Sequence, residues 1–230
     1  MGDKRLTVKR DELLNQIRPT VHRIELEEPR QGFPEIVIVK QEKPEWGDEF
    51  LQEINAYNRL QHLQGTMIPI LFGQGSFNES PALILSEVEG ITLRDLAKFD
   101  ESTVPEKILE SELENVFKEL YMCGAEHCDL NLGNFLFCNN GKVVVIDLEE
   151  VEFPDRRQSW ERSVNLGSVG YLMSRFRDVR YPNRPPSPLY WASASGASND
   201  VSGSEELDLP VMSLVSQDLK EPNFVVLERK

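Results

Sequence analysis

Residues 127–147 read HCDLNLGNFLFCNNGKVVVID, and this stretch carries most of the information about the fold and the function of the chain. Two apolar segments, FLFC and VVVID, flank an Asn-Asn-Gly sequence that is typical of a tight turn, so they predict a β-hairpin. The second strand is expected to end at Asp147, which would place this carboxylate opposite Asn134. Oxygen ligands from a loop and from the end of a strand suit a magnesium ion.

The polar loop 127–134 offers the other groups that a phosphoryl transfer needs. Asp129 would accept the proton of an acceptor hydroxyl, Asn134 would give its amide oxygen to the metal, and His127 would brace the loop through hydrogen bonds. The alternative is an Asp- and Asn-rich turn with one buried histidine, in which Asp147 only ends its strand. The functional interpretation is favoured because the groups occur together.

The segment PEIVIVK, residues 34–40, contains a β-branched run and predicts a strand that ends near Lys40. From residue 45 to residue 64 apolar side chains recur every three or four positions, which predicts an amphipathic helix with Glu53 near its buried face. A strand lysine that is oriented by a helix carboxylate can bind phosphate oxygens. Taken alone, a solvated edge lysine and a solvated glutamate would be the simpler explanation of this pair.

The remaining patterns predict a β-rich first part and a helical second part. Further strands are predicted at 21–26, 68–72 and 82–85, and further helices at 92–99, 105–122 and 166–176. Residues 1–20 are expected to be a polar lead-in. Between residues 182 and 204, Pro, Ser and Gly make up 12 of 23 positions, so burial is not expected to offset the entropy cost of ordering. Residues 181–230 are therefore predicted to be a disordered tail.

The composition excludes several classes of function. The formal net charge is −14, which repels polyphosphate backbones and argues against binding of nucleic acid or of an anionic membrane. Three cysteines without zinc-site spacing indicate reduced thiols. No signal-peptide h-region and no long apolar run is present, so a soluble protein of the cytoplasm or nucleus is expected.

Together these motifs resemble the protein-kinase-like superfamily, from about residue 21 to residue 153. VIVK resembles the strand with the nucleotide-binding lysine, EINAY the helix with its glutamate partner, HCDLNLGN the catalytic loop and IDLEE the metal-binding segment. The order of the four motifs makes the joint signal stronger than any one of them. The chain is most similar to compact members, the aminoglycoside-phosphotransferase-like and small fungal kinase-like proteins.

The resemblance implies an α+β, protein-kinase-like bilobal fold. A small β-rich N-lobe would span about 21–86 and a reduced helical C-lobe about 91–180, joined by a hinge at about 86–90. In that hinge, the backbone of Glu87, Val88 and Glu89 would meet the adenine of ATP, with Leu85 as gatekeeper. ATP and Mg²⁺ are the implied cofactors, and the partners would be ATP and a hydroxyl-bearing acceptor.

The chain also departs from the pattern of the superfamily. No G-x-G-x-x-G precedes Lys40, Cys128 replaces the usual arginine, and Leu148 and Glu149 replace Phe and Gly. The main prediction is an ATP- and Mg²⁺-dependent phosphotransferase. The alternatives are a pseudokinase or truncated kinase-like binding module without turnover, and a small-molecule kinase. For the last, the acidic residues Glu149, Glu150 and Glu152 would attract a cationic acceptor, unless they form a solvated loop.

Overall fold

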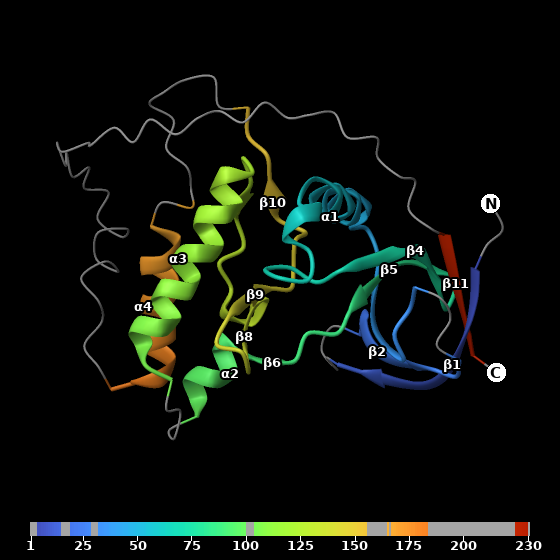
Figure 1. Ribbon diagram of the computed structural model, residues 1–230, viewed down its shortest axis with the longest axis horizontal. Helices are drawn as coiled ribbons and strands as arrows, with labels where there is room; N and C mark the ends of the chain where they lie inside the picture. Colours follow the sequence, from blue (N-terminus) through green and yellow to red (C-terminus); the bar gives the residue numbers. More distant parts are fainter. Residues whose placement is uncertain are drawn as a thin grey trace.

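The computed structural model describes residues 4–14, 19–28, 32–99, 104–155, 165, 167–183 and 224–229, and shows a mixed α+β arrangement (Figure 1). The strands are β1 (Lys4–Leu13), β2 (Val21–Leu26), β3 (Ile36–Gln41), β4 (Leu71–Phe77), β5 (Ser80–Ser86), β6 (Gly90–Thr92), β7 (Glu126–His127), β8 (Phe135–Cys138), β9 (Val143–Val145), β10 (Val151–Glu152) and β11 (Phe224–Arg229). The α-helices are α1 (Gly47–Arg59), α2 (Leu93–Lys98), α3 (Glu106–Met122) and α4 (Ser168–Arg180). None of the helices in these described ranges has the length and apolar character of a membrane span.

Six strands form a closed barrel in the order β1-β11-β4-β5-β3-β2. The alternating sequence of β2, VHRIEL, buries His22, Ile24 and Leu26 on one face, and β3 buries Val37 and Val39 in the barrel core. The turn between β4 and β5 uses Asn78 and Glu79, both at positive φ. Residues 73–77, which the sequence assigned to the turn between two strands, are therefore part of β4.

The strand β11 closes the barrel, and this overturns part of the predicted chain organisation. It pairs in parallel with β1 on one side and β4 on the other, so that the first and last described strands lie side by side in the barrel (Figure 1). The prediction of a tail disordered throughout 181–230 is wrong for Phe224–Arg229, because Val225 and Leu227 are buried in the barrel core. The remaining tail residues, 184–223 and 230, lie outside the described residues.

The prediction of a polar lead-in over residues 1–20 is also wrong, because Lys4–Leu13 form β1. Its charged side chains alternate with Leu6 and Val8, which are buried in the barrel. The β-rich part of the chain therefore begins at β1 and not at residue 21. At Gly75 on β4, an added Cβ would lie 1.6 Å from the carbonyl oxygen of Val225, so the close approach of β11 requires glycine there.

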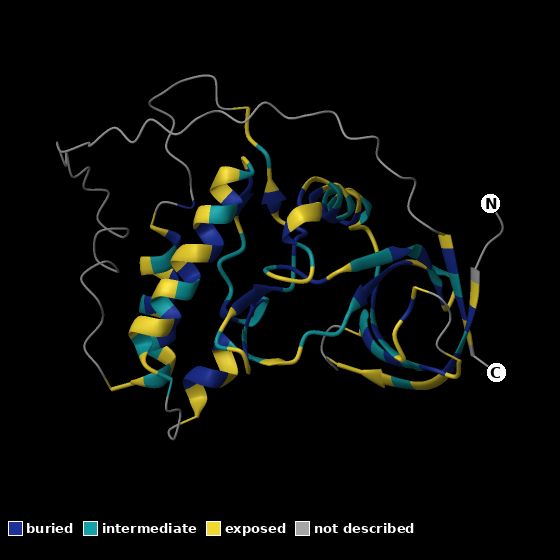
Figure 2. Cartoon of the chain, viewed as in Figure 1, coloured by how far each residue is buried: buried dark blue, intermediate teal, exposed yellow. Residues whose placement is uncertain are grey.

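A second core joins α1 to the helices α2, α3 and α4 (Figure 2). The amphipathic helix predicted from residue 45 to residue 64 is confirmed as α1, followed by a 3₁₀ turn at Gln61–Leu63, and Gly65 then takes a left-handed conformation. The helices predicted at 92–99, 105–122 and 166–176 correspond to α2, α3 and α4. The mixed α+β class with a β-rich N-terminal part is thus confirmed, and the two-lobed division stays a prediction.

The hairpin predicted from residues 135–147 is present as β8 and β9, and it positions the polar loop beside Asp147. β9 pairs with β8, which in turn pairs with β6. Downstream, β10 returns to pair with β7, directly before the loop. The loop that begins at Cys128 and the segment that begins at Asp147 are consequently fixed next to each other by two separate strand pairs.

Candidate active site

Lys40 lies on β3 with its side chain buried beneath α1. Its Nζ donates a hydrogen bond of 2.9 Å to Oε1 of Glu53 and lies 2.8 Å from the other carboxylate oxygen. Glu53 is fully buried on the inner face of α1. A solvated lysine and a solvated glutamate are therefore excluded, and the structure brings together the two residues that the sequence paired.

Two further carboxylates approach the same ammonium group. Lys40 Nζ donates to Oδ1 of Asp147 at 2.7 Å, and Oε1 of Glu149 lies 3.1 Å away. Glu149 also pairs with Lys43, which lies over the ring of Trp46. In the sequence nothing distinguishes Glu149 from the neighbouring acidic residues, but its side chain is buried. The prediction that it faces a cationic acceptor or solvent is wrong, because two lysines of this chain bind it.

The charges in this cluster shift one another's protonation. Burial alone would lower the pKa of Lys40, but Glu53, Asp147 and Glu149 outweigh it and hold the pKa well above its usual value. Burial is the largest single effect on Asp147 and opposes its ionisation, but Lys40, the backbone N–H of Glu149 and Lys43 together outweigh it and lower the pKa of this carboxyl group. Lys40 is thus cationic and Asp147 anionic at neutral pH, as binding of phosphate and of a metal requires.

The loop after β7 places the proposed acceptor base. The Asn134 side-chain amide donates a 2.7 Å hydrogen bond to Oδ2 of Asp129, so these two predicted residues lie side by side. Asn131 supports the loop by accepting a hydrogen bond from the backbone N–H of Gly133 at 2.9 Å. The bond to Asp129 uses only the amide nitrogen of Asn134, which leaves the carbonyl oxygen of that amide for a cation.

His127 connects this loop to the segment that begins at Asp147. Its Nε2 donates to the backbone carbonyl of Asp147 at 2.9 Å, and the ring packs against Phe135. Burial lowers the pKa of His127, so the ring is neutral and the Nε2 atom carries its proton. The side chain of Asn165, a residue the sequence did not point to, accepts a hydrogen bond from the backbone N–H of His127. His127 therefore acts as a positioning residue, which agrees with its predicted bracing role.

A cavity of about 470 Å³ lies against these groups and has the size of a small-molecule site. Lys40, Lys43, Asn134 and Asp147 are among the polar residues that line it. Its apolar lining includes Ile38, the predicted gatekeeper Leu85, Leu136 and Ile146. Asp147 also lines a smaller adjoining cavity of about 80 Å³, which it shares with Asp129 and Lys43.

The predicted hinge residues are only partly at this cavity. The segment 87–89 connects β5 to β6, and Glu87 and Val88 line the cavity. Glu89 is exposed and does not line it. The carboxylate of Glu87 accepts hydrogen bonds from the guanidinium of Arg23 at 2.5 and 3.4 Å, so only its backbone is suited to meet a base.

The donor set fits Mg²⁺. Asn134 and Asp147 both supply oxygen, the ligand atom that this ion prefers, and both line the larger cavity. Glu53 and Glu149 also place carboxylate oxygens near Asp147, with all three groups within 4.8 Å of one another. Neither Glu53 nor Glu149 lines the larger cavity, so Asn134 and Asp147 are the residues that would hold the ion.

The sequence of residues 54–162 matches the ABC1 atypical kinase-like domain family. The chain belongs to the protein-kinase-like superfamily. The matched segment of this kinase-like chain contains His127, Asp129, Asn134 and Asp147, whereas Lys40 and Glu53 lie before it. A search of curated proteins found no match. The contact between Lys40 and Asp147 therefore joins a residue before the matched segment to one within it.

Proposed function

We propose that this chain is an ATP- and Mg²⁺-dependent phosphotransferase that moves the γ-phosphoryl group to a hydroxyl acceptor. The observation that supports this best is the meeting of Lys40, Glu53 and Asp147 at one edge of a cavity of about 470 Å³. Burying these charged groups carries a desolvation cost, which a fold without a functional site would not have to bear. The match to a kinase-like family supports the same class of function.

Each residue has a separate task in this proposal. Lys40 would bind phosphate oxygens, and Glu53 would hold the ammonium group in place. Asn134 and Asp147 would bind Mg²⁺, which when bound neutralises charge on the phosphates. Asp129 would position the acceptor hydroxyl and take its proton, while His127 keeps the backbone at Asp147 beside the catalytic loop.

The test of this proposal is ATP turnover by the full chain with Mg²⁺, compared between wild type and Asp129→Asn. Loss of the base is expected to lower turnover by about 10²-fold or more. Asp48→Asn is the matched control, because Asp48 is an exposed carboxylate at the start of α1 that lines neither the 470 Å³ cavity nor the 80 Å³ cavity. Equal turnover in wild type and Asp129→Asn would reject the role of Asp129.

A second candidate function is a pseudokinase or kinase-like binding module. It is favoured by Glu149, which binds Lys40 and Lys43 and so competes with phosphates for both cations. It is also favoured by the connection between β1 and β2, where residues 14–20 contain no glycine to bring backbone N–H groups close to phosphates. Binding of ATP without any turnover, in wild type as in Asp129→Asn, would support this candidate.

A further inference from the structure

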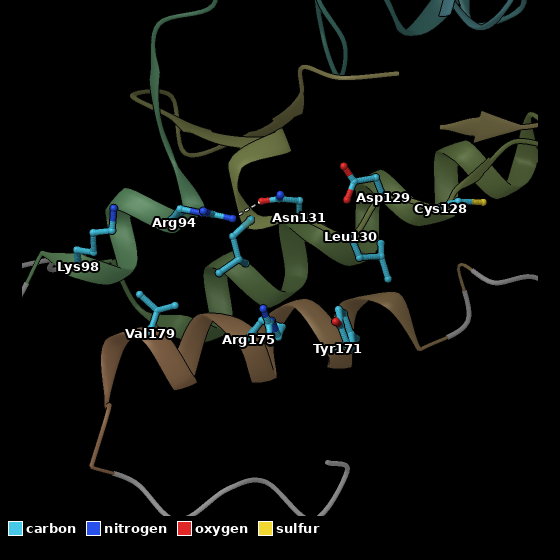
Figure 3. Close-up of a pocket in the computed structure, with 10 residues that line it drawn as sticks. Arg94, Lys98, Cys128, Asp129, Leu130, Asn131, Tyr171, Arg175 and Val179 are labelled. Carbon is cyan, nitrogen blue, oxygen red and sulfur yellow. Dashed lines mark hydrogen bonds between the residues drawn. The ribbon is translucent and has the colours of Figure 1, made fainter. Parts of the chain in front are cut away.

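A third cavity, of about 730 Å³, lies on the other side of the catalytic loop, between α2 and α4 (Figure 3). Arg94 and Lys98 reach it from α2, and Tyr171 and Arg175 reach it from α4, while Asp129 belongs to its loop wall. The volume lies in the range of small-molecule sites, and the four side chains from α2 and α4 are exposed at its rim.

The charges in this cavity oppose those of the chain as a whole. Three cationic side chains and one carboxylate line it, although the net charge of the protein is −14. Arg94 donates to the neutral amide oxygen of Asn131 at 2.7 Å, and Arg175 forms no ion pair within the described residues. Only Lys98 has a carboxylate partner, the exposed Asp95. Within the described part of the chain, neither guanidinium group forms an ion pair with a carboxylate, and guanidinium binds phosphate and carboxylate well.

Asp129 links this cationic cavity to the phosphate side of the candidate active site. It lines the 730 Å³ cavity, and it also lines the 80 Å³ cavity that contains Asp147 and Lys43. A molecule in the cationic cavity can thus bring a hydroxyl group to Asp129, which also lines the cavity that contains Asp147. Glu149, in contrast, is occupied by two lysines and is not free to attract a cationic acceptor.

We propose that the cationic cavity binds the acceptor, and that the acceptor is a small hydroxylated organic anion whose phosphate or carboxylate group is bound by Arg94 and Arg175. This inference rests on the proposed phosphotransferase function. In the reaction, the acceptor oxygen forms a bond to the γ-phosphorus as the bond from that phosphorus to the β–γ bridging oxygen breaks. ADP leaves, and the hydroxyl proton passes to Asp129 and then to solvent.

The first experiment measures binding and does not need turnover. Glycerol 3-phosphate, glycerate and glycerol are each added to the full chain, with and without saturating ADP and Mg²⁺, and the thermal midpoint is recorded. At least one of the two anions is expected to raise the midpoint while glycerol leaves it unchanged, and comparison of the two anions separates phosphate from carboxylate recognition. No shift with either anion would overturn the inference.

The second experiment assigns the effect to the cavity. Arg175→Gln is expected to weaken binding of the anion by about tenfold, which corresponds to about 1.4 kcal/mol, and Arg175→Lys is expected to restore part of it. Lys118→Gln removes the same charge from an exposed site on α3 that lines none of the three cavities, and should bind as wild type does. Equal weakening in Arg175→Gln and Lys118→Gln would reject a specific site.

A third readout separates this inference from the proposed function. With MgATP, the anion is expected to increase ADP formation by wild type, and Arg175→Gln is expected to raise the KM of the anion with little change in kcat. Turnover that prefers glycerol would overturn the inference and leave the phosphotransferase proposal intact. Anion binding that depends on Arg175, without any ATP turnover, would instead reject the phosphotransferase and keep the anion site.

Discussion

The closing strand β11 allows a direct test of the fold, through the substitution Leu227→Ala. Leu227 is only 4% exposed and packs in the core of the barrel with Val225 and side chains from the other strands. Replacing a buried leucine by alanine typically costs about 2–5 kcal/mol, through lost apolar burial and the cavity left behind. The free energy of unfolding is therefore expected to fall by that amount.

The assay is urea unfolding of the full chain, followed by circular dichroism. At a slope of about 2 kcal/mol/M, the expected loss moves the midpoint down by about 1–2.5 M. Phe224→Ala is the matched control, since Phe224 lies on the same strand but is 52% exposed, and its effect should stay within about 0.5 kcal/mol. Equal midpoints for wild type and Leu227→Ala would refute the position of β11 in the barrel.

Three further predictions follow from individual contacts. Gly75→Ala should destabilise the protein by about 1–3 kcal/mol or more, because its Cβ would meet the backbone of Val225. The control Gly170→Ala lies in helix α4 with open space around it and should raise the free energy of unfolding by about 0.5–1 kcal/mol. Equal unfolding midpoints for the two variants would contradict this. Since burial lowers the pKa of His127, the unfolded state binds more protons below about pH 6.5, and the free energy of unfolding should fall as pH drops from 7 towards 5.5. His127→Gln should show a shallower fall in pH-dependent urea titrations, and parallel curves would reject the assignment. Glu149→Gln removes a competing carboxylate from Lys40 and Lys43. It should therefore tighten MgATP binding, measured by calorimetry, by about tenfold (about 1.4 kcal/mol). Weaker binding would instead indicate that Glu149 helps to hold the metal.

The central part of the site could be predicted because its residues follow from local patterns. A β-branched run that ends at Lys40 and an amphipathic helix that carries Glu53 define a strand and a helix that meet at the Lys40–Glu53 pair. The Asn-Asn-Gly turn then fixes the hairpin that places Asp147 beside the polar loop. Each of these signals lies within about twenty residues, and the order of the motifs supplied the long-range arrangement.

The barrel strands at the two ends of the chain were not predicted, because their partners are remote in sequence. In β11, Val225 and Leu227 alternate with period two, but the pattern is short. It follows a long Pro- and Ser-rich stretch whose composition indicates disorder. In β1 the charged residues concealed Leu6 and Val8. Glu149 shows the same difficulty at the site, since an acidic residue within an acidic run gives no sign of burial until Lys40 and Lys43 are placed around it.

The most direct test of the account is calorimetric titration of ATP into wild type and Asp147→Asn, each with and without Mg²⁺. Mg²⁺ is expected to strengthen ATP binding to wild type. Asp147→Asn is expected to lose most of this strengthening, because the variant lacks one metal ligand. Absence of ATP binding to wild type, or an equal effect of Mg²⁺ on both proteins, would contradict the claim that these residues form a nucleotide and metal site.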